Sequence, residues 1–215
     1  MKNLVIFDLD GTLVNTIDDL GTATNHALKA LGYPTHNIQS YNNMVGNGVT
    51  RLLERALPDD ARTTRIVEAM RLHFREYYDN HLWDYSQPYA GITELLDELV
   101  SRNIHIAVAS NKYQEAVTRI IDHFFGTLPW AAVHGNRPDV PVKPDPSVVF
   151  AILGECPTPK ADVLYVGDSG IDIETARRAC VENVGVSWGF RTTLELTQAH
   201  ADHIVSTPDD ILSLL

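Results

Sequence analysis

The sequence is poor in cysteine, and it contains no long apolar run. Cys156 and Cys180 are the only two cysteines among 215 residues, and no Cys-x-x-Cys pair occurs. Neither a disulfide framework nor a zinc site is therefore expected. No apolar stretch approaches the roughly 18 residues that a membrane-spanning helix needs, and the chain reaches a carboxylate too early for a signal peptide. We expect a cytoplasmic protein with no membrane partner.

Positive charge is also scarce. The chain has 17 lysines and arginines against 28 aspartates and glutamates, a formal net charge of -11 at pH 7. A non-specific grip on nucleic acid needs clustered lysine and arginine, so this balance argues against a nucleic-acid partner. Glycine-rich nucleotide motifs are missing too. No Walker loop occurs, and Arg51 stands where a dinucleotide-binding loop would have its third glycine.

Short apolar runs alternate with helical patterns along most of the chain. Strands are expected at residues 4–8, 104–110, 130–134, 163–167 and 184–188. Helices between successive strands imply crossover units and a parallel sheet. The expected fold class is α/β, with a doubly wound, Rossmann-like parallel sheet. Polar residues at the carboxyl ends of such strands meet in one crevice.

The stretch between about residues 15 and 83 contains no convincing strand. It contains three helical patterns, whose apolar faces are Ile17, Leu20, Ala27, Leu28 and Leu31; Val49, Leu52, Leu53, Ala56 and Leu57; and Ile66, Met70, Phe74, Tyr77 and His81. These spacings follow the helical repeat. We predict a catalytic core formed by residues 1–14 and 84–215, and a helical domain inserted at residues 15–83.

The first predicted strand ends in two carboxylates, Asp8 and Asp10, followed by Gly11 and Thr12. In extended chain the two carboxylates share a face, and they repel each other unless a cation neutralises them or one binds a proton. Oxygen ligands suit magnesium, which binds through one or two carboxylates together with substrate phosphate. Asp8 would then be a nucleophile and Asp10 a general acid.

The run from Asp8 to Thr12 resembles the first motif of the haloacid dehalogenase superfamily, and three further motifs of that superfamily follow in order. Ser110 and Asn111 end the second long strand, as in the second motif. Lys143 precedes a proline, as in the third motif. Asp168 and Asp172 follow the strand at 163–167, as in the acidic fourth motif.

This resemblance implies a magnesium-dependent phosphomonoesterase that works through an aspartyl-phosphate, with a mobile helical cap over the site. It implies Asp8 and Asp10 as catalytic residues, and Asp8, Asp10 and Asp168 as ligands of Mg²⁺. Thr12, Ser110, Asn111 and Lys143 would bind the phosphoryl group. Asp168 and Asp172 lie near one face of a helical turn, so that one can ligate the metal while the other orients a water or Lys143.

The inserted helices carry the best indication of a substrate. The segment from Met44 to Leu57 resembles the cap of phosphoglycolate phosphatases. Gly46, Asn47 and Gly48 form a turn that opens a helix, so backbone N–H groups there could receive a small carboxylate, and Arg51 could add charge. A helix cap with a solvated arginine explains the same residues equally well. The substrate class is a small phosphate ester, with 2-phosphoglycolate as the first candidate.

Several alternatives stay open. The enzyme could act on another small phosphate ester or on pyrophosphate, or it could be a phosphomutase. A catalytically silent binding module on the same fold is the non-enzyme alternative, although the intact acidic motifs disfavour it. The chain could be a monomer or a homodimer. Asn15 replaces an acidic residue found in many relatives, and Cys180 replaces a common glycine, for which we expect only a structural effect.

Overall fold

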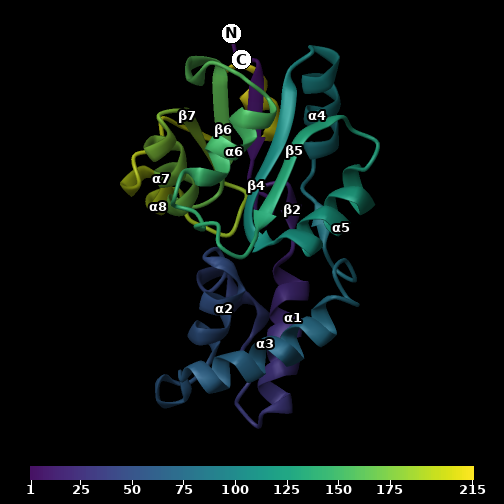
Figure 1. The fold of residues 1–215 in the computed structure, drawn as a ribbon, viewed down its shortest axis with the longest axis vertical. Helices are drawn as coiled ribbons and strands as arrows, with labels where there is room; N and C mark the ends of the chain where they lie inside the picture. Colours follow the sequence, from purple (N-terminus) through teal and green to yellow (C-terminus); the bar gives the residue numbers. More distant parts are fainter. The chain divides into compact units, whose positions relative to one another are not determined.

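A computed structural model describes residues 1–215, and the chain divides into two compact units. The first unit comprises residues 1–15 and 88–215, and the second comprises residues 16–87. Figure 1 shows the first unit as a strand-centred body and the second as a group of helices. Each unit contains fully buried hydrophobic side chains, such as Ile6 and Val166 in the first unit and Leu53 and Met70 in the second.

The first unit is organised around a six-stranded sheet with the order β5-β4-β1-β6-β7-β8. All pairings are parallel. The strands are β1 (Leu4–Phe7), β4 (His105–Tyr113), β5 (Trp130–Asn136), β6 (Val163–Gly167), β7 (Glu182–Val186) and β8 (His203–Val205). This confirms the doubly wound α/β fold. A separate two-stranded sheet is formed by β2 (Val14–Asn15) and β3 (Gln87–Pro88).

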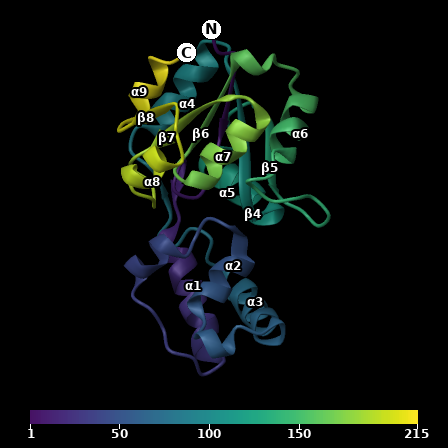
Figure 2. The ribbon, with the colours of Figure 1, turned by 90° about the vertical axis from the view of Figure 1, so that its left-hand side faces the viewer.

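Helices alternate with these strands along the chain, as Figure 2 shows. They are α4 (Ile92–Ser101), α5 (Gln114–Phe125), α6 (Ser147–Glu155), α7 (Gly170–Ala179), α8 (Thr193–Gln198) and α9 (Pro208–Leu212). On one sheet face, Leu4, Ile6 and Tyr165 form a buried cluster with residues of α6 and α7. Because side chains alternate along a strand, Val5 and Phe7 point to the other face, and both are fully buried.

The predicted strands differ from the observed ones in several places, and the strand expected at 184–188 lies at Glu182–Val186. The second long strand does not end at residue 110 but continues to Tyr113, with a register shift against β5 between Ala109 and Tyr113. The short strand β8 was not predicted, because three residues with one buried position carry no readable alternation. The parallel arrangement brings the carboxyl ends of β1, β4 and β6 to one edge of the sheet.

The second unit consists of α1 (Ile17–Ala30), α2 (Gly48–Ala56) and α3 (Thr64–Tyr78), with short 3₁₀ segments at Ile38–Asn43 and Asp59–Ala61. Polar groups fix its connections. The buried carboxylate of Asp19 accepts hydrogen bonds from the backbone N–H of Ser86 at 2.8 Å and from its hydroxyl at 2.6 Å. The Asn25 side-chain oxygen accepts from the Tyr41 hydroxyl at 2.7 Å.

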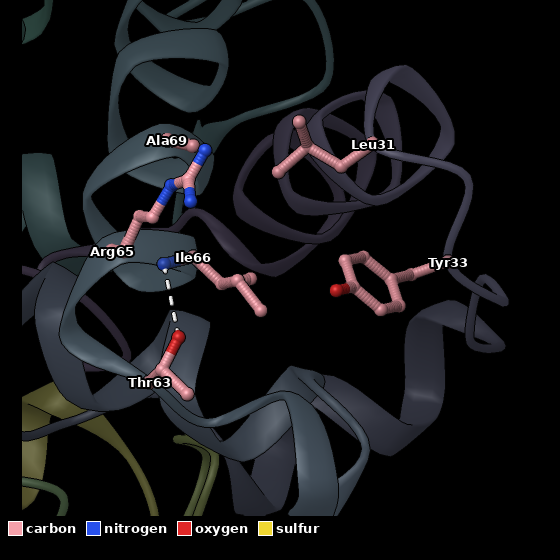
Figure 3. A pocket seen from close by; sticks show the side chains of 6 residues that line it. All are labelled: Leu31, Tyr33, Thr63, Arg65, Ile66 and Ala69. Carbon is pink, nitrogen blue, oxygen red and sulfur yellow. Dashed lines mark hydrogen bonds between the residues drawn. The ribbon is translucent and has the colours of Figure 1, made fainter.

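The predicted face of the third helix is partly wrong. Its buried residues are Val67, Met70, Phe74 and Tyr78, one position away from Ile66 and Tyr77, which are half-buried. Ile66 instead lines an open cavity of 470 Å³ together with Leu31, Tyr33, Thr63, Arg65 and Ala69 (Figure 3). The Thr63 hydroxyl accepts the backbone N–H of Ile66 there and caps α3. No helix in the structure is both long and apolar enough to cross a membrane.

Candidate active site

Asp8 follows the last residue of β1 and carries the first predicted catalytic carboxylate. Its backbone N–H donates to the Val166 carbonyl at 2.9 Å, which continues the strand pairing by one residue. Its Oδ1 lies 2.9 Å from the Lys143 ammonium, and its side chain is 12% exposed. Burial and the charge of Asp172 raise the pKa of Asp8 to about 7, against the lowering effect of Lys143. The carboxylate is therefore withdrawn from water and lies beside a second carboxylate.

Lys143 is the cation of this site, and every hydrogen bond of its ammonium stays within the buried edge. Its Nζ donates to Asp172 Oδ1 at 2.7 Å and to the Ala109 carbonyl at 2.8 Å, besides its contact with Asp8. Burial works against its charge, but Asp172 and Asp8 outweigh burial and raise the pKa of Lys143 well above its usual value. The Lys143 ammonium is thus held in its charged form beside Asp8.

Asp168 and Asp172 have different partners, although both follow β6. Asp168 Oδ2 accepts the backbone N–H of Phe190 at 2.7 Å, and burial, then Asp172 and Asp8, raise its pKa well above the usual value. Asp172 takes part in the capping box of α7, because its Oδ2 accepts the backbone N–H of Ser169 at 3.2 Å, and it also accepts the Ser169 hydroxyl at 2.6 Å. Its Oδ1 accepts from Lys143. The structure therefore places Asp172 as the residue that orients Lys143.

Asp10 stands apart from this group. Its Oδ1 forms an ion pair with the Lys112 ammonium at 2.8 Å. Gly11, with a φ of +87°, makes the turn that follows, and a side chain there would clash with the Asp168 carboxylate. Thr12 lies in the same loop and is fully buried, and its hydroxyl has no hydrogen-bond partner.

Ser110 and Asn111 come from the extended part of β4, and both are buried. The Asn111 side chain forms two hydrogen bonds with the backbone of Lys143, accepting its N–H at 2.8 Å and donating to its carbonyl at 3.0 Å. The Ser110 hydroxyl accepts the backbone N–H of Lys112 at 3.2 Å. Asn111 thus ties the second motif to the third, and Ser110 lies on the same segment.

The carboxylates form one cluster that has the donor chemistry of a cation site. One oxygen each from Asp8, Asp168 and Asp172 lies within 4.8 Å of the others. Three carboxylates share this space with the single ammonium of Lys143. Burial first, and then the neighbouring carboxylates, raise the pKa values of Asp8 and Asp168. An all-oxygen donor set with excess negative charge fits magnesium. Of the three predicted ligands, the structure brings the carboxylates of Asp8 and Asp168 together.

The predicted cap residues lie in the second unit, around the start of α2. Gly46 and Gly48 have φ values of +120° and +79°, conformations that glycine adopts easily. Asn47 precedes the helix but makes no capping hydrogen bond. Its Oδ1 instead accepts from Arg55 at 2.6 Å. Arg51 pairs with Glu54 of the same helix at 2.7 Å, and its side chain is 66% exposed.

Several residues that surround the carboxylates were not predicted from the sequence. Lys112 pairs with Asp10. Its position two residues after Ser110 was the one feature of the sequence that could have indicated a place near the site. The Phe190 N–H and the Trp188 indole, which donates to the Thr12 carbonyl at 3.1 Å, belong to a loop after β7 that carries no recognisable motif. The Tyr165 hydroxyl lies 3.3 Å from Asp172 and looks like an ordinary strand residue in the sequence.

Comparison with known proteins shows which family the chain belongs to. A phosphoglycolate phosphatase from Aquifex aeolicus is 32% identical to the chain, with 99% of the chain and 96% of the relative covered. One from Pseudomonas syringae pv. tomato is 29% identical, with 100% and 79% covered. A solved structure from Lactobacillus delbrueckii subsp. bulgaricus, provisionally assigned as a phosphoglycolate phosphatase, superimposes with a TM-score of 0.93 at 28% identity, with 100% and 98% covered. The family model for haloacid dehalogenase-like hydrolases matches residues 5–186, and the chain therefore belongs to that family.

Proposed function

We propose that this protein is a phosphoric monoester hydrolase that transfers the phosphoryl group of a small ester to Asp8 and then to water. One observation carries the proposal. The Asp8 carboxylate lies at the edge of the sheet, 2.9 Å from a buried lysine ammonium that is held in turn by Asp172. A fixed cation can bind the oxygens of a phosphoryl group, and a carboxylate positioned beside that cation can then attack the phosphorus atom.

Two of the chain's groups would bind the transferring phosphoryl group. The Lys143 ammonium faces Asp8 directly, and the hydroxyl of Ser110 comes from the neighbouring strand β4. Asn111 keeps Lys143 in place through its two hydrogen bonds to the lysine backbone. These preorganised donors would stabilise the negative charge on the phosphoryl oxygens. Positioning and charge stabilisation of this kind are the main source of catalysis in phosphoryl transfer.

Asp10 supplies the proton transfers. As an Asp8 oxygen bonds to phosphorus, the bond from phosphorus to the ester oxygen breaks, and Asp10 gives that oxygen a proton. Asp10 then takes a proton from a water that attacks the phosphorus of the aspartyl-phosphate. Inorganic phosphate leaves, and the Asp8 carboxylate is regenerated. General acid–base assistance of this kind contributes about 10²- to 10⁴-fold.

Magnesium fits the acidic cluster and is the proposed cofactor. Asp8 and Asp168 would hold it through their carboxylates, and Asp10 would join them through its backbone carbonyl. When bound, the ion neutralises the carboxylates and the phosphate oxygens that face them. Asp172 is committed to Lys143 and to the cap of α7, so it supports the site rather than completing the ligand set.

We propose 2-phosphoglycolate as the substrate and the second unit as a cap over the site. Several similar relatives are phosphoglycolate phosphatases. In this chain the N-terminus of α2 and Arg51 offer donors for a small carboxylate. Product glycolate and phosphate would then be released as the cap opens. The cytoplasmic location stays a prediction.

The test is a panel of phosphate esters assayed with purified enzyme. We expect hydrolysis of 2-phosphoglycolate and of 4-nitrophenyl phosphate, abolished by chelator and restored by magnesium. Calcium should restore it poorly, because its looser, higher coordination does not suit the reaction geometry. Full activity in excess chelator would remove the metal from the proposal. Higher kcat/KM for a hexose phosphate, a nucleotide or pyrophosphate would replace the substrate.

A further inference from the structure

Lys112 is a second buried lysine at the catalytic edge, and no part of the proposed mechanism uses it. Its side chain is 3% exposed, and it lies 2.8 Å from Asp10, whose side chain is 14% exposed. An ammonium withdrawn from water costs several kcal/mol unless a partner compensates it. An exposed loop lysine would avoid that cost by pointing outward. Lys112 instead points inward, onto the residue proposed as general acid and base.

The local backbone explains how Lys112 reaches Asp10. Strand β4 continues past Ser110 to Tyr113, and its register against β5 shifts in this stretch. Such irregularities re-aim side chains next to active sites. The backbone N–H of Lys112 also donates to the Ser110 hydroxyl. The same short segment therefore carries one residue proposed to bind phosphoryl oxygen and one that reaches Asp10.

Asp10 belongs to a turn rather than to a strand or a helix. It lies in the turn between β1 and β2, where it forms an isolated bridge with Val14 and precedes Gly11 with its positive φ. A side chain on such a turn can adopt several rotamers. If proton transfer needs one particular rotamer, time spent in the others lowers the reaction rate. An ion pair from a buried neighbouring strand restricts that choice. Lys112 engages the Oδ1 atom of that carboxylate.

We propose that Lys112 is a positioning residue that holds the Asp10 carboxylate where it can exchange a proton with the leaving oxygen. This inference rests on the proposed function. It gives the two buried lysines of the site different roles. Lys143 orients the nucleophile and binds phosphoryl oxygen, whereas Lys112 acts on the reaction only through Asp10.

The experiment is a double-mutant cycle between Asp10→Asn and Lys112→Met, with 2-phosphoglycolate and 4-nitrophenyl phosphate as substrates. A displacement of a catalytic group by about 1 Å can lower the reaction rate by up to 10²-fold. We expect Lys112→Met to lower kcat for 2-phosphoglycolate by about 10- to 100-fold with KM nearly unchanged. The phosphorylation step should be affected less for 4-nitrophenyl phosphate, whose leaving group needs little protonation. Lys112→Arg should restore part of the activity.

The cycle separates action through Asp10 from an independent role. In the Asp10→Asn background, Lys112→Met should cause no further loss, because the group that it positions is gone. Equal losses in both backgrounds would overturn the inference. A raised KM for 2-phosphoglycolate with unchanged kcat would also overturn it, because Lys112 would then bind substrate directly.

Lys2→Met is the matched control. Lys2 is also a buried lysine with an ion pair, 2.6 Å from Glu182, and it donates to the Ala161 carbonyl at 2.8 Å. It precedes β1, at the opposite edge of the sheet from Asp8. Lys2→Met should lower the thermal midpoint without changing the leaving-group dependence. If Asp10→Asn itself shows no leaving-group dependence, the proposed role of Asp10 fails, which is a different result from failure at Lys112.

Discussion

The catalytic edge of the first unit and the start of α2 in the second unit are both proposed to contact the substrate, but their charged side chains differ in burial and in pairing. In the first unit, Asp8 and Lys143 are buried and joined to each other, and the lysine is joined to Asp172. In the second unit, Arg51 is 66% exposed and pairs with Glu54 three residues along its own helix. Exposed pairs of this kind contribute about 0–1 kcal/mol, whereas removing one partner of a buried pair costs about 3–5 kcal/mol.

This difference indicates which part of the reaction each segment controls. Fixed, buried charges suit bond making and breaking, because they need no reorganisation as the reaction proceeds. An exposed arginine at the start of a helix can adapt to different leaving groups. Substitutions in the first unit should therefore change rates by orders of magnitude, and substitutions near Arg51 should change preferences between esters.

The largest effect is expected at Asp8. Asp8→Asn keeps the size of the side chain but removes the nucleophilic oxygen, and loss of a nucleophile costs about 10⁴-fold or more. We expect loss of activity toward every ester, alkyl or aryl. Steady-state kinetics with circular dichroism as a check of folding measures this. Retention of more than a few per cent of turnover in a folded variant would contradict the assignment.

Asp10→Asn should have the next largest effect. The loss should reach about 10²- to 10⁴-fold for 2-phosphoglycolate. The phosphorylation step should be affected less with an aryl ester, because phenolate leaves without a proton. Rapid-quench measurement of the first turnover with both esters isolates that step. Metal affinity is measured in parallel, since equal losses together with weak magnesium binding would point to a ligand role instead.

The pKa of Asp8 predicts a pH-dependent change in stability that disappears in Asp8→Asn. Its pKa is raised from 3.8 to about 7 in the folded protein, so the folded state binds the proton more tightly than the unfolded state. Wild-type stability should therefore fall relative to Asp8→Asn as pH rises from about 4 to about 7, by a few kcal/mol at most. Urea unfolding in chelator tests this. A difference between the two proteins that does not change with pH would show that Asp8 ionises normally.

Arg51→Ala tests the second unit. We expect KM for 2-phosphoglycolate to rise by about 10-fold, equivalent to about 1.4 kcal/mol, while KM for the uncharged 2-hydroxyethyl phosphate stays nearly constant. Arg71→Ala is the matched control, because Arg71 forms an equivalent pair with Glu68 at 2.6 Å on α3. Equal effects of Arg51→Ala on KM for both esters would mean that Arg51 does not bind the substrate carboxylate.

The smallest expected effect concerns Cys180, which ends α7 with a φ of +59°. Glycine adopts this left-handed conformation without strain, so Cys180→Gly should raise the free energy of unfolding by about 1 kcal/mol. Cys156 ends α6 with a φ of -126°, where glycine brings no such relief. Cys156→Gly should therefore lower the free energy. Urea unfolding of both variants makes the comparison, and equal shifts would contradict it.

The fold, and the places of the acidic motifs at the strand ends, could be predicted because their signals are local. Buried parallel strands read as apolar runs, and Asp8, Ser110 and Asp168 each follow such a run directly. Partners that come from distant segments could not be predicted in this way. The ion pair between Lys112 and Asp10 joins positions 102 residues apart, and nothing in either segment alone indicates it.

Helix faces were less predictable for a related reason. In α3 the residues Ile66 and Tyr77 suit the helical repeat as well as Val67 and Tyr78 do, and only packing against α1 and α2 decides which stripe is buried. The contacts of the cap residues could not be predicted either, because they depend on packing that the local sequence does not indicate. The turn at Gly46 and Gly48 was readable from its glycines, whereas the hydrogen bonds of Arg55 to Asn47 and to the Met44 carbonyl were not.

The most direct test of the account is to trap the phosphoryl group on the enzyme. Asp10→Asn with 4-nitrophenyl phosphate suits this purpose, because an aryl leaving group departs without a proton whereas hydrolysis of the aspartyl-phosphate still needs the base. Acid quenching followed by peptide mass spectrometry should show phosphate on Asp8, and none when Asp8→Asn is added. Phosphate on another residue, or steady release of nitrophenol without any phosphorylated enzyme, would contradict the central claim.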